Sequence, residues 1–487
     1  FSVVVLFLCA GILTPKEMLE GFSNKGMITV ALLFLVSEGI RQSGTLGQVI
    51  KKLLPQGKTT VFKAQLRILP SVAFISAFLN NTPVVVIFAP IIKHWAKSVN
   101  LPATKFLIPL SYVTILGGIC TLIGTSTNLV VHGMILEAGF EGFSMFELGK
   151  VGIFIAIAGI IYIFLFSKRL LPDARPDTAV PDEEVEEGEK LHRVEAVLGA
   201  RFPGINKKLK DFNFQRHYGA EVKEIKTRNG QRFVTNLDDV VLHEGDTLVV
   251  MADDTFIPTW GESSVFVLLT NGNEPDTTGK KKRWFALLLL VLMIVGATVG
   301  ELPITKEMFP GIKLDMFFFV SITTIIMAWT NLFPARKYTK YISWDILITI
   351  ACAFAISKAM VNSGVADSVA KFIIGLSDDY GPHVLLAMVF IITNLFTELI
   401  TNNAAAALAF PLALSISAQL GVSPTPFFVV ICMAASASFS TPIGYQTNLI
   451  VQGIGNYKFT DFVRIGLPLN IITFLISIIL IPLIWNF

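Results

Sequence analysis

The sequence has little charge and almost no cysteine. Of its 487 residues only 15% are charged, whereas 53% are hydrophobic. The formal net charge of +3 is too small to indicate a nucleic-acid partner, and no basic stripe with interleaved aromatic residues occurs. All four cysteines lie in apolar runs, which favours small buried residues over a disulfide framework or a metal site. Nucleic-acid binding and disulfide-stapled folds are therefore not expected.

Catalytic motifs are missing as well. The six histidines are dispersed, and the chain has no His-x-x-x-His spacing, no Cys-x-x-Cys spacing and no complete Walker motif. Nothing indicates a nucleophile next to a base, so we do not expect an enzyme. A gated channel is a less favoured alternative, because no repeated carbonyl-filter segment such as Thr-Val-Gly-Tyr-Gly is present.

Long apolar runs are what the sequence has in abundance. Runs of about 20 apolar residues recur along the chain, a length that crosses the hydrocarbon core of a bilayer. We therefore expect a polytopic α-helical protein, multi-pass in a plasma or inner cell membrane. The chain opens at Phe1 inside such a run, and the spacing of the runs predicts one further span before it.

Short polar clusters interrupt these apolar runs, and they occur twice. Asn80-Asn81-Thr82 and Thr401-Asn402-Asn403 each end eight residues before a proline, Pro90 or Pro411. The loops at residues 124–128 and 444–448 form a second pair, with a spacing of 320 residues. A third pair, residues 37–44 and 357–364, keeps that spacing. The chain is therefore predicted to contain two repeats.

The polar clusters favour a binding site at membrane depth. Unpaired polar groups in hydrocarbon cost several kcal/mol each, so irregular polar segments there must face protein or a water-filled site. Side-chain amides, hydroxyls and freed carbonyls suit a hard cation, while helix N-termini suit an anion. Residues 83–92 are too short to cross the bilayer and predict half of a re-entrant hairpin. We expect two repeats, inverted in the membrane plane, with hairpins and broken helices; the alternative is that these small residues only help helices pack closely.

A less apolar insert separates the repeats. Residues 1–170 are expected to form the first transmembrane repeat and residues 284–487 the second. Between them lie an acidic linker at residues 171–190, a small α+β domain at residues 191–260 and a second linker at residues 261–283. Strands are predicted near residues 194–198, 221–227 and 247–252, and a helix near residues 205–212. Basic residues flank the insert on both sides, so residues 171–283 are expected in the cytoplasm.

At these clusters the sequence resembles the divalent anion:sodium symporter family of the ion transporter superfamily. The signature of that family is a Ser-Asn-Thr triplet at the tip of a hairpin in each half, plus a Gly-Thr…Asn loop in each half. The clusters at residues 80–82, 401–403, 124–128 and 444–448 correspond to these motifs and cover both membrane halves. The soluble stretch resembles a TrkA-C (RCK C-terminal) domain, and the combination resembles permeases called sodium/sulfate symporters.

The resemblance implies an elevator-type homodimer in the bilayer that couples Na⁺ to the symport of a small inorganic or organic dianion. It implies one Na⁺ at Ser76, Asn80, Asn81 and the Gly124 loop, with Asn128, and a second Na⁺ at Thr397, Ile400, Asn402 and the Gly444 loop, with Asn448. It implies substrate contacts at Asn81, Thr82, Thr125, Ser126, Asn402, Asn403, Tyr445 and Gln446. A small ligand or nucleotide is the implied effector of the soluble domain. Glu398, next to the second cluster, either binds a proton or cation or orients nearby amides.

Two departures from the family pattern bear on the substrate. Asparagine replaces the first residue of one triplet and the last of the other, at Asn80 and Asn403. Tyr445-Gln446 stands where a small residue and a proline are common. A bulky tyrosine would shrink the pocket, so we expect sulfate, a compact tetrahedral oxyanion, with a di- or tricarboxylate as the alternative.

Overall fold

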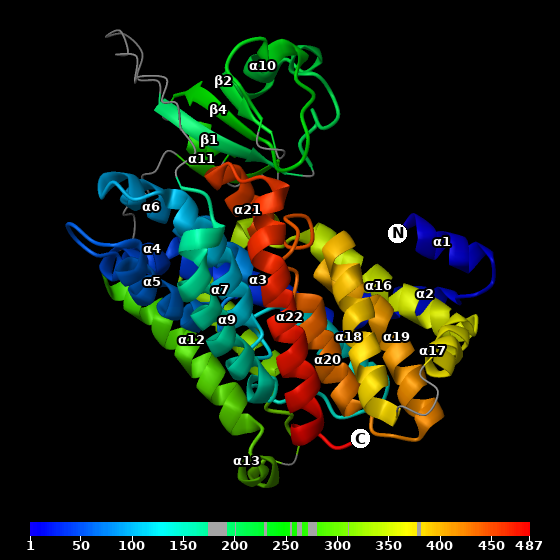
Figure 1. The fold of residues 1–487 in the computed structure, drawn as a ribbon. Helices are drawn as coiled ribbons and strands as arrows, with labels where there is room; N and C mark the ends of the chain where they lie inside the picture. The colour runs from blue at the N-terminus through cyan, green and yellow to red at the C-terminus, as the bar shows by residue number, and fades with distance from the viewer. Residues whose placement is uncertain are drawn as a thin grey trace.

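The computed structural model describes residues 1–173, 192–199, 201–227, 231–253, 256–260, 265–270, 280–309, 311–376 and 381–487. A large helical body carries a small β-sheet domain on one of its ends (Figure 1). Residues 174–190 of the predicted acidic linker lie outside the described residues.

Two series of helices follow the same order along the chain. The first is α1 (Ser2–Cys9), α2 (Pro15–Glu20), α3 (Lys25–Gln42), α4 (Thr45–Leu53), α5 (Val61–Ser76), α6 (Asn81–Ser98), α7 (Leu107–Gly118), α8 (Ser126–Glu137) and α9 (Gly149–Leu170). The second is α14 (Met316–Trp329), α15 (Tyr338–Tyr341), α16 (Trp344–Asn362), α17 (Val365–Leu376), α18 (Gly381–Leu399), α19 (Asn402–Leu420), α20 (Thr425–Ser436), α21 (Gln446–Gly455) and α22 (Phe459–Ile484), preceded by α12 (Lys280–Gly300) and α13 (Pro303–Met308). Each doubled polar cluster falls at the same place in both series, where one helix ends and the next begins.

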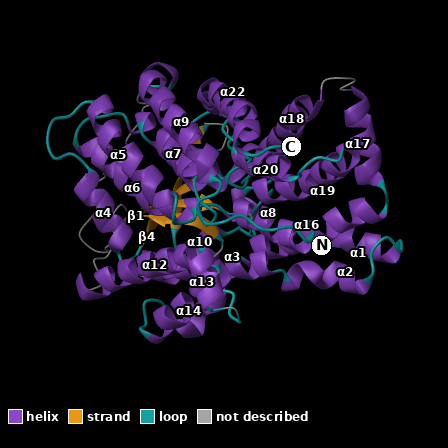
Figure 2. Cartoon of the chain, turned by 90° about the horizontal axis from the view of Figure 1, so that it is seen from below, coloured by secondary structure: helices purple, strands orange, loops and turns teal. Residues whose placement is uncertain are grey.

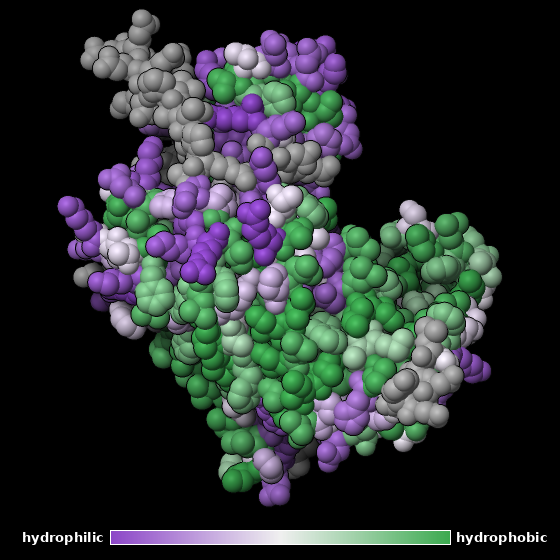
Figure 3. Space-filling model, in the orientation of Figure 1, coloured by the Kyte–Doolittle hydropathy of each residue, from purple (hydrophilic) through white to green (hydrophobic). Residues whose placement is uncertain are grey.

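The helical body has the dimensions and surface of a membrane protein. Among the described residues, seven helices are long and apolar enough to cross a bilayer: Pro15–Gln42, Gly149–Leu170, Lys281–Gly300, Trp344–Asn362, Gly381–Leu399, Asn402–Leu420 and Phe459–Ile484. Apolar side chains cover the visible face of the body, whereas polar ones gather on the sheet domain (Figure 3). On α22 the exposed residues Leu467, Ile471, Leu475 and Ile479 recur every fourth position, as a lipid-facing stripe does.

The two helices that follow the Asn-containing clusters are longer than the sequence predicted. We expected the first to end near residue 92, but α6 continues through Pro90 to Ser98. For the second we expected residues 404–414, but α19 continues through Pro411 to Leu420. Proline removes one hydrogen bond and kinks a helix, but inside a packed apolar bundle the helix can resume beyond it. The proline therefore lies within each helix and does not end it.

The two series pack into each other around the broken helices. Viewed from below, α4–α7 and α9 lie on one side and α16–α20 on the other (Figure 2). Helix α8 of the first series packs on α19 and α20, while α21 of the second packs on α6 and α7. This exchange brings segments more than 270 residues apart in the sequence into contact.

The insert is built on a single antiparallel sheet. Its strands are β1 (His192–Leu198), β2 (Glu221–Lys226), β3 (Arg232–Phe233), β4 (Thr247–Ala252) and β5 (Phe266–Thr270), in the order β3-β2-β4-β1-β5, with the short helices α10 (Phe214–Tyr218) and α11 (Phe256–Trp260). The three predicted strands are confirmed, and β5 lies within residues 261–283, where we expected a linker. The predicted helix at residues 205–212 is wrong: a short 3₁₀ turn, Leu209–Asp211, is the helical element there. Asn206 adopts a left-handed φ of 61° and its backbone N–H bonds to Leu242, which interrupts a helix.

The sheet sits directly on the far ends of α6 and α21. Lys93 Nζ on α6 lies 2.9 Å from both carboxylate oxygens of Glu195 in β1. On α21, a Cβ added to Gly453 would stand 2.6 Å from Thr247 Oγ1 in β4, so a larger residue would force a neighbour to shift. The sheet therefore contacts one helix from each series.

Candidate functional site

The four helix breaks meet around one hydroxyl group. Tyr445, at the start of α21, is 7% exposed. Its Oη lies 2.5 Å from the Asn81 amide at the start of α6 and 2.9 Å from Thr125 Oγ1 before α8. It also hydrogen-bonds with the Asn402 side chain at the start of α19. One oxygen atom thus joins all four broken segments.

Two further sets of contacts connect the breaks in pairs. The Thr82 hydroxyl donates to Gln446 Oε1 at 3.3 Å, which links the starts of α6 and α21. The hydroxyls of Ser126 and Thr127 donate to Asn403 Oδ1 at 3.3 and 3.1 Å, which links the starts of α8 and α19. All eight residues predicted to contact the substrate therefore lie in this one cluster.

Asn128 and Asn448 brace the two loops in the same way. Asn128 Nδ2 donates to the carbonyls of Thr121 at 2.9 Å and Gly118 at 3.5 Å. Asn448 Nδ2 donates to the corresponding carbonyls of Thr441 at 3.1 Å and Ser438 at 2.8 Å. The Asn128 amide oxygen is buried and has no hydrogen-bond partner among the described residues, whereas that of Asn448 accepts from Ser111 at 2.7 Å. The recurring brace explains why both loops contain Thr-Asn at the same spacing.

Backbone contacts hold each loop against the preceding helix end. The Thr121 hydroxyl donates to the carbonyl of Ala77, and Gly124 N–H donates to Thr121 Oγ1 at 3.2 Å. In the second series Thr441 donates to the carbonyl of Glu398 at 3.1 Å, and Gly444 N–H donates to Thr441 Oγ1 at 3.4 Å. The two breaks therefore share one hydrogen-bonding scheme.

The predicted ligands of the first cation come together around the Asn81 amide. Asn81 is fully buried, and one end of its amide lies 2.8 Å from Ser76 Oγ and 3.3 Å from the Gly124 carbonyl oxygen. The Thr114 carbonyl oxygen, 2.9 Å away, joins them. Sequence analysis missed it, because a backbone carbonyl carries no residue signature. Oxygen donors of this kind are the ligands that a hard cation takes.

The predicted ligands of the second cation are arranged less tightly. Thr397 donates to the Ala435 carbonyl at 2.6 Å, and its own carbonyl accepts from Ser438 Oγ at 3.3 Å. A Cβ on Gly444 would stand 2.2 Å from that carbonyl, so the loop can approach only as glycine. Ile400 is 37% exposed, and neither it nor Asn80 takes part in the described hydrogen bonds of the Tyr445 cluster. Those two predicted ligands are thus not brought into the cluster by their side chains.

The electrostatics of the cluster come from dipoles and not from charged side chains. Its members are the neutral residues Asn81, Thr82, Thr125, Ser126, Thr127, Asn402, Asn403, Tyr445 and Gln446. Four helices, α6, α8, α19 and α21, begin here, and each N-terminus carries partial positive charge. The arrangement can attract an anion without burying a cationic side chain.

Glu398 lies beside the second break with partners that the sequence did not reveal. Its Oε1 accepts from the Ser440 backbone N–H at 2.9 Å and from Asn470 Nδ2 at 2.7 Å. Asn470 also donates to Ser440 Oγ at 2.9 Å. The available signal was a single asparagine amid the apolar residues of α22. Glu398 therefore ties α18, the α20–α21 loop and α22 together.

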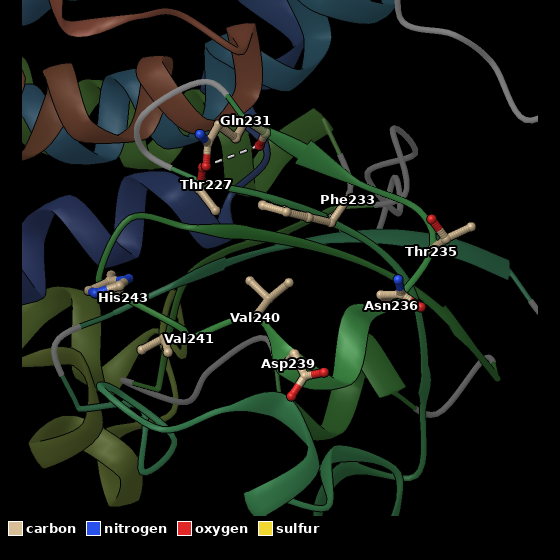
Figure 4. A pocket seen from close by; sticks show the side chains of 9 residues that line it. All are labelled: Thr227, Gln231, Phe233, Thr235, Asn236, Asp239, Val240, Val241 and His243. Atoms are coloured by element: carbon tan, nitrogen blue, oxygen red, sulfur yellow. Dashed lines mark hydrogen bonds between the residues drawn. The ribbon is translucent and has the colours of Figure 1, made fainter.

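A separate pocket of about 660 Å³ lies in the insert (Figure 4). Its lining residues are Thr227, Gln231, Phe233, Thr235, Asn236, Asp239, Val240, Val241 and His243. Asp239 is held by Lys208 and Lys210 at 3.2 and 2.9 Å. The pocket is far in sequence from the Tyr445 cluster, and its described lining residues all belong to the sheet domain.

Comparison with known proteins identifies similar transporters. The citrate transporter family matches residues 1–420. An uncharacterized transporter of Synechocystis sp. is 30% identical over 99% of this chain and 93% of its own length. The uncharacterized transporter YfbS of Escherichia coli is 25% identical over 100% of this chain and 95% of its length. Sodium/sulfate cotransporter 2 of Chlamydomonas reinhardtii is 31% identical over 58% of this chain, which corresponds to 31% of that larger protein.

Proposed function

The chain belongs to the citrate transporter family, and we propose that it is a Na⁺-coupled symporter of a divalent anion, with sulfate as the substrate. Relatives named sodium/sulfate cotransporters support both the anion and the ion. The observation that carries the proposal is the meeting of four helix N-termini and neutral polar side chains around Tyr445 Oη. Such a site can bind an anion and a cation side by side.

We assign the first Na⁺ to the oxygens around Asn81 and the second to the region of Thr397, Asn402 and the Gly444 loop. A cation there would supply the positive charge that the side chains lack. Bound Na⁺ would lower the cost of placing a dianion at the adjacent helix N-termini, because opposite charges attract strongly where water is scarce. Transport of the anion would then require Na⁺.

Sulfate is favoured by the bulk and position of the Tyr445 side chain. The phenol side chain is buried and lies between the breaks, so it limits the length of any bound anion. Tyr, Gln, Thr and Asn can all donate hydrogen bonds to a compact oxyanion. The second candidate is a di- or tricarboxylate, which the description of the matching family as a citrate transporter favours.

The proposal extends to the movement and assembly of the protein. The same order of helices in both series, with breaks at matching places, supports two inverted repeats in the membrane plane. We propose an elevator movement that carries the site across the membrane, in a homodimer. Hairpins that enter the membrane from the same side, in an experimental map with the bilayer visible, would contradict this topology.

We propose that the insert is a cytoplasmic TrkA-C-like regulator. None of its described residues belongs to the Tyr445 cluster, and its pocket could hold a small ligand or nucleotide. Its contacts with α6 and α21 support a regulatory role, because both helices begin at the site. Replacing residues 173–279 by a short linker should preserve Na⁺-coupled uptake and change its regulation. A deletion protein that folds, reaches the membrane and lacks all uptake would contradict a purely regulatory role.

The test of function is a flux measurement in proteoliposomes. An inward Na⁺ gradient should drive saturable uptake of radiolabelled sulfate, and replacing Na⁺ by choline should abolish it. Succinate and citrate serve as competitors: strong competition without sulfate uptake would replace sulfate by a carboxylate. An ohmic current without saturable uptake would indicate a channel and contradict the symport proposal.

A further inference from the structure

The Asn81 amide fits its surroundings in two orientations. With nitrogen toward α5 and α7, its two hydrogens face three acceptors: Ser76 Oγ at 2.8 Å and the carbonyl oxygens of Thr114 at 2.9 Å and Gly124 at 3.3 Å. With oxygen on that side, it accepts from Ser76 and meets the two carbonyl oxygens without a hydrogen atom between them. In the first orientation hydrogen atoms lie between the amide and its neighbours, whereas in the second the clustered oxygens need a cation among them.

The oxygens in the second orientation are spaced as ligands of one cation. Ligands that each lie about 2.3–2.6 Å from a cation of this size sit roughly 3 Å apart. The distances from that end of the Asn81 amide agree with this spacing: 2.8 Å to Ser76 Oγ, 2.9 Å to the Thr114 carbonyl oxygen and 3.3 Å to the Gly124 carbonyl oxygen. Bringing carbonyl oxygens together in a buried place is costly, and a bound cation reverses the sign of that interaction. Sodium therefore favours the orientation that is otherwise the poorer one.

The opposite end of the amide faces Tyr445 Oη at 2.5 Å, so its orientation decides what that hydroxyl does. A hydroxyl has one hydrogen to donate. When the amide oxygen faces Tyr445, the hydroxyl donates its hydrogen to Asn81 and offers lone pairs elsewhere. When the amide nitrogen faces Tyr445, the hydroxyl accepts from Asn81, and its hydrogen is available to Thr125, Asn402 or a bound anion.

We propose that Asn81 is a two-position switch that couples Na⁺ to the anion through the Tyr445 hydroxyl; this inference rests on the proposed function. Sodium turns the amide oxygen toward Ser76, Thr114 and Gly124. The amide nitrogen then faces Tyr445, whose O–H becomes a donor to the anion. Without sodium the Tyr445 hydrogen is held by Asn81, and the site presents lone pairs that repel an anion. Sodium therefore binds first, and Asn81 and Tyr445 position donors for the anion.

The experiment measures anion affinity with and without sodium on the purified full-length protein. Titration calorimetry gives the dissociation constant for sulfate in NaCl and in choline chloride, and their ratio is the coupling factor. Separately, Na⁺ alone is titrated against the apparent melting temperature. Coupling between two sites is typically about 5–150-fold in affinity, and we expect the wild-type protein to lie in that range.

Tyr445→Phe is the decisive variant, and Tyr162→Phe is its control. Tyr162 is another buried tyrosine, on α9 and away from the site. Its hydroxyl donates to the Ile465 carbonyl at 3.0 Å. Tyr445→Phe should keep the Na⁺-induced rise in melting temperature, because its hydroxyl is not a cation ligand. Its affinity for sulfate in NaCl should fall about tenfold, which corresponds to one hydrogen bond to a charged group, and its coupling factor should therefore move toward 1. Tyr162→Phe should keep both properties.

Ser76→Ala tests the other end of the switch. Losing one cation ligand should raise the Na⁺ concentration needed for half of the thermal shift, while the coupling factor at saturating Na⁺ stays near that of wild type. Wild-type coupling in Tyr445→Phe, or loss of the Na⁺-induced shift in that variant, would overturn the inference alone. A wild-type protein that binds Na⁺ but neither sulfate, succinate nor citrate would overturn the proposed function, and this inference with it.

Discussion

The break between α5 and α6 and the break between α18 and α19 are held by the same hydrogen bonds but surrounded by different residues. In the first series Ala77 occupies the position that Glu398 has in the second. Cys120 likewise corresponds to Ser440. The first break is thus backed by apolar side chains, whereas the second is backed by a carboxylate, an amide and a hydroxyl.

Buried polar atoms without a hydrogen-bond partner gather beside the second break. Glu398 Oε2 and Asn470 Oδ1 are buried without a partner among the described residues, as are Ser436 Oγ and Ser477 Oγ on the neighbouring α20 and α22. A buried polar atom without a partner costs about 1–3 kcal/mol. The two breaks therefore share one hydrogen-bonding framework, while their different surroundings make the two candidate cation sites unequal.

The largest effect is expected when the central amide of each break is removed. Asn81→Ala and Asn402→Ala should both fold and lose Na⁺-dependent uptake. Each variant loses a polar group whose interaction with a charged ligand contributes about 1.5–3 kcal/mol. The affinity for that ligand should therefore fall roughly 10–100-fold. Asn81→Ala should be the more damaging, because Asn81 also contacts Ser76, Thr114 and Gly124. Radiolabelled uptake at several Na⁺ concentrations measures this, and near wild-type uptake in both variants would exclude the proposed cation sites.

The second prediction tests whether Glu398 supports the second break. Glu398→Ala leaves the Ser440 N–H and the Asn470 amide without their acceptor. The variant should lose about 1–3 kcal/mol of stability. Glu301→Ala is the control, since Glu301 is a partly buried glutamate with a single backbone donor, Met145 N–H at 3.1 Å. Apparent melting temperatures compare the two, and an equal loss in both would mean that the Glu398 network has no special role.

The sequence was sufficient to predict which segments break and that they belong together. The repeated clusters carry side-chain types and spacing, and equal spacing in two repeats implies equivalent positions in space. It could not predict that Tyr445 Oη would be the common atom, because that contact depends on α21 crossing onto α6 and α7. Nor could it reveal Thr114, whose contribution is a backbone carbonyl, or Asn470, which meets Glu398 across 72 residues. The extent of α6 and α19 beyond their prolines depends on tertiary packing that local sequence does not encode.

The third prediction concerns selectivity and separates the size of Tyr445 from its hydroxyl. Tyr445→Ala should weaken sulfate uptake and admit succinate, because it opens space between the breaks and removes a donor. Tyr445→Phe keeps the ring, so it should weaken sulfate uptake without admitting succinate. Competition assays in proteoliposomes measure both. If the wild-type protein already prefers succinate to sulfate, the size argument is wrong and the carboxylate alternative takes its place.

The smallest expected effect lies where the sheet domain contacts α6. Although burial raises the pKa of Glu195, Lys93 and Lys226 outweigh it and hold the pKa at about 2, below the usual 4.5. A lowered pKa stabilises the folded protein above about pH 4.5, and this contribution is lost as the pH falls toward 2. Lys93→Ala removes the nearest cation but leaves Lys226, 3.4 Å from Glu195, so the loss should be about 1–2 kcal/mol at neutral pH.

The pH dependence distinguishes this ion pair from simple packing at the same interface. If Lys93 acts through the Glu195 charge, the difference in melting temperature between wild type and Lys93→Ala should shrink as the pH falls below 4.5. The control is Lys223→Ala, which removes a lysine of the same sheet that pairs with the exposed Glu221 at 2.7 Å and should change stability little at any pH. A difference that stays constant with pH would show that Lys93 contributes only the packing of its aliphatic stem. The charge of Glu195 would then play no part in linking the sheet domain to α6, the helix that begins at Asn81.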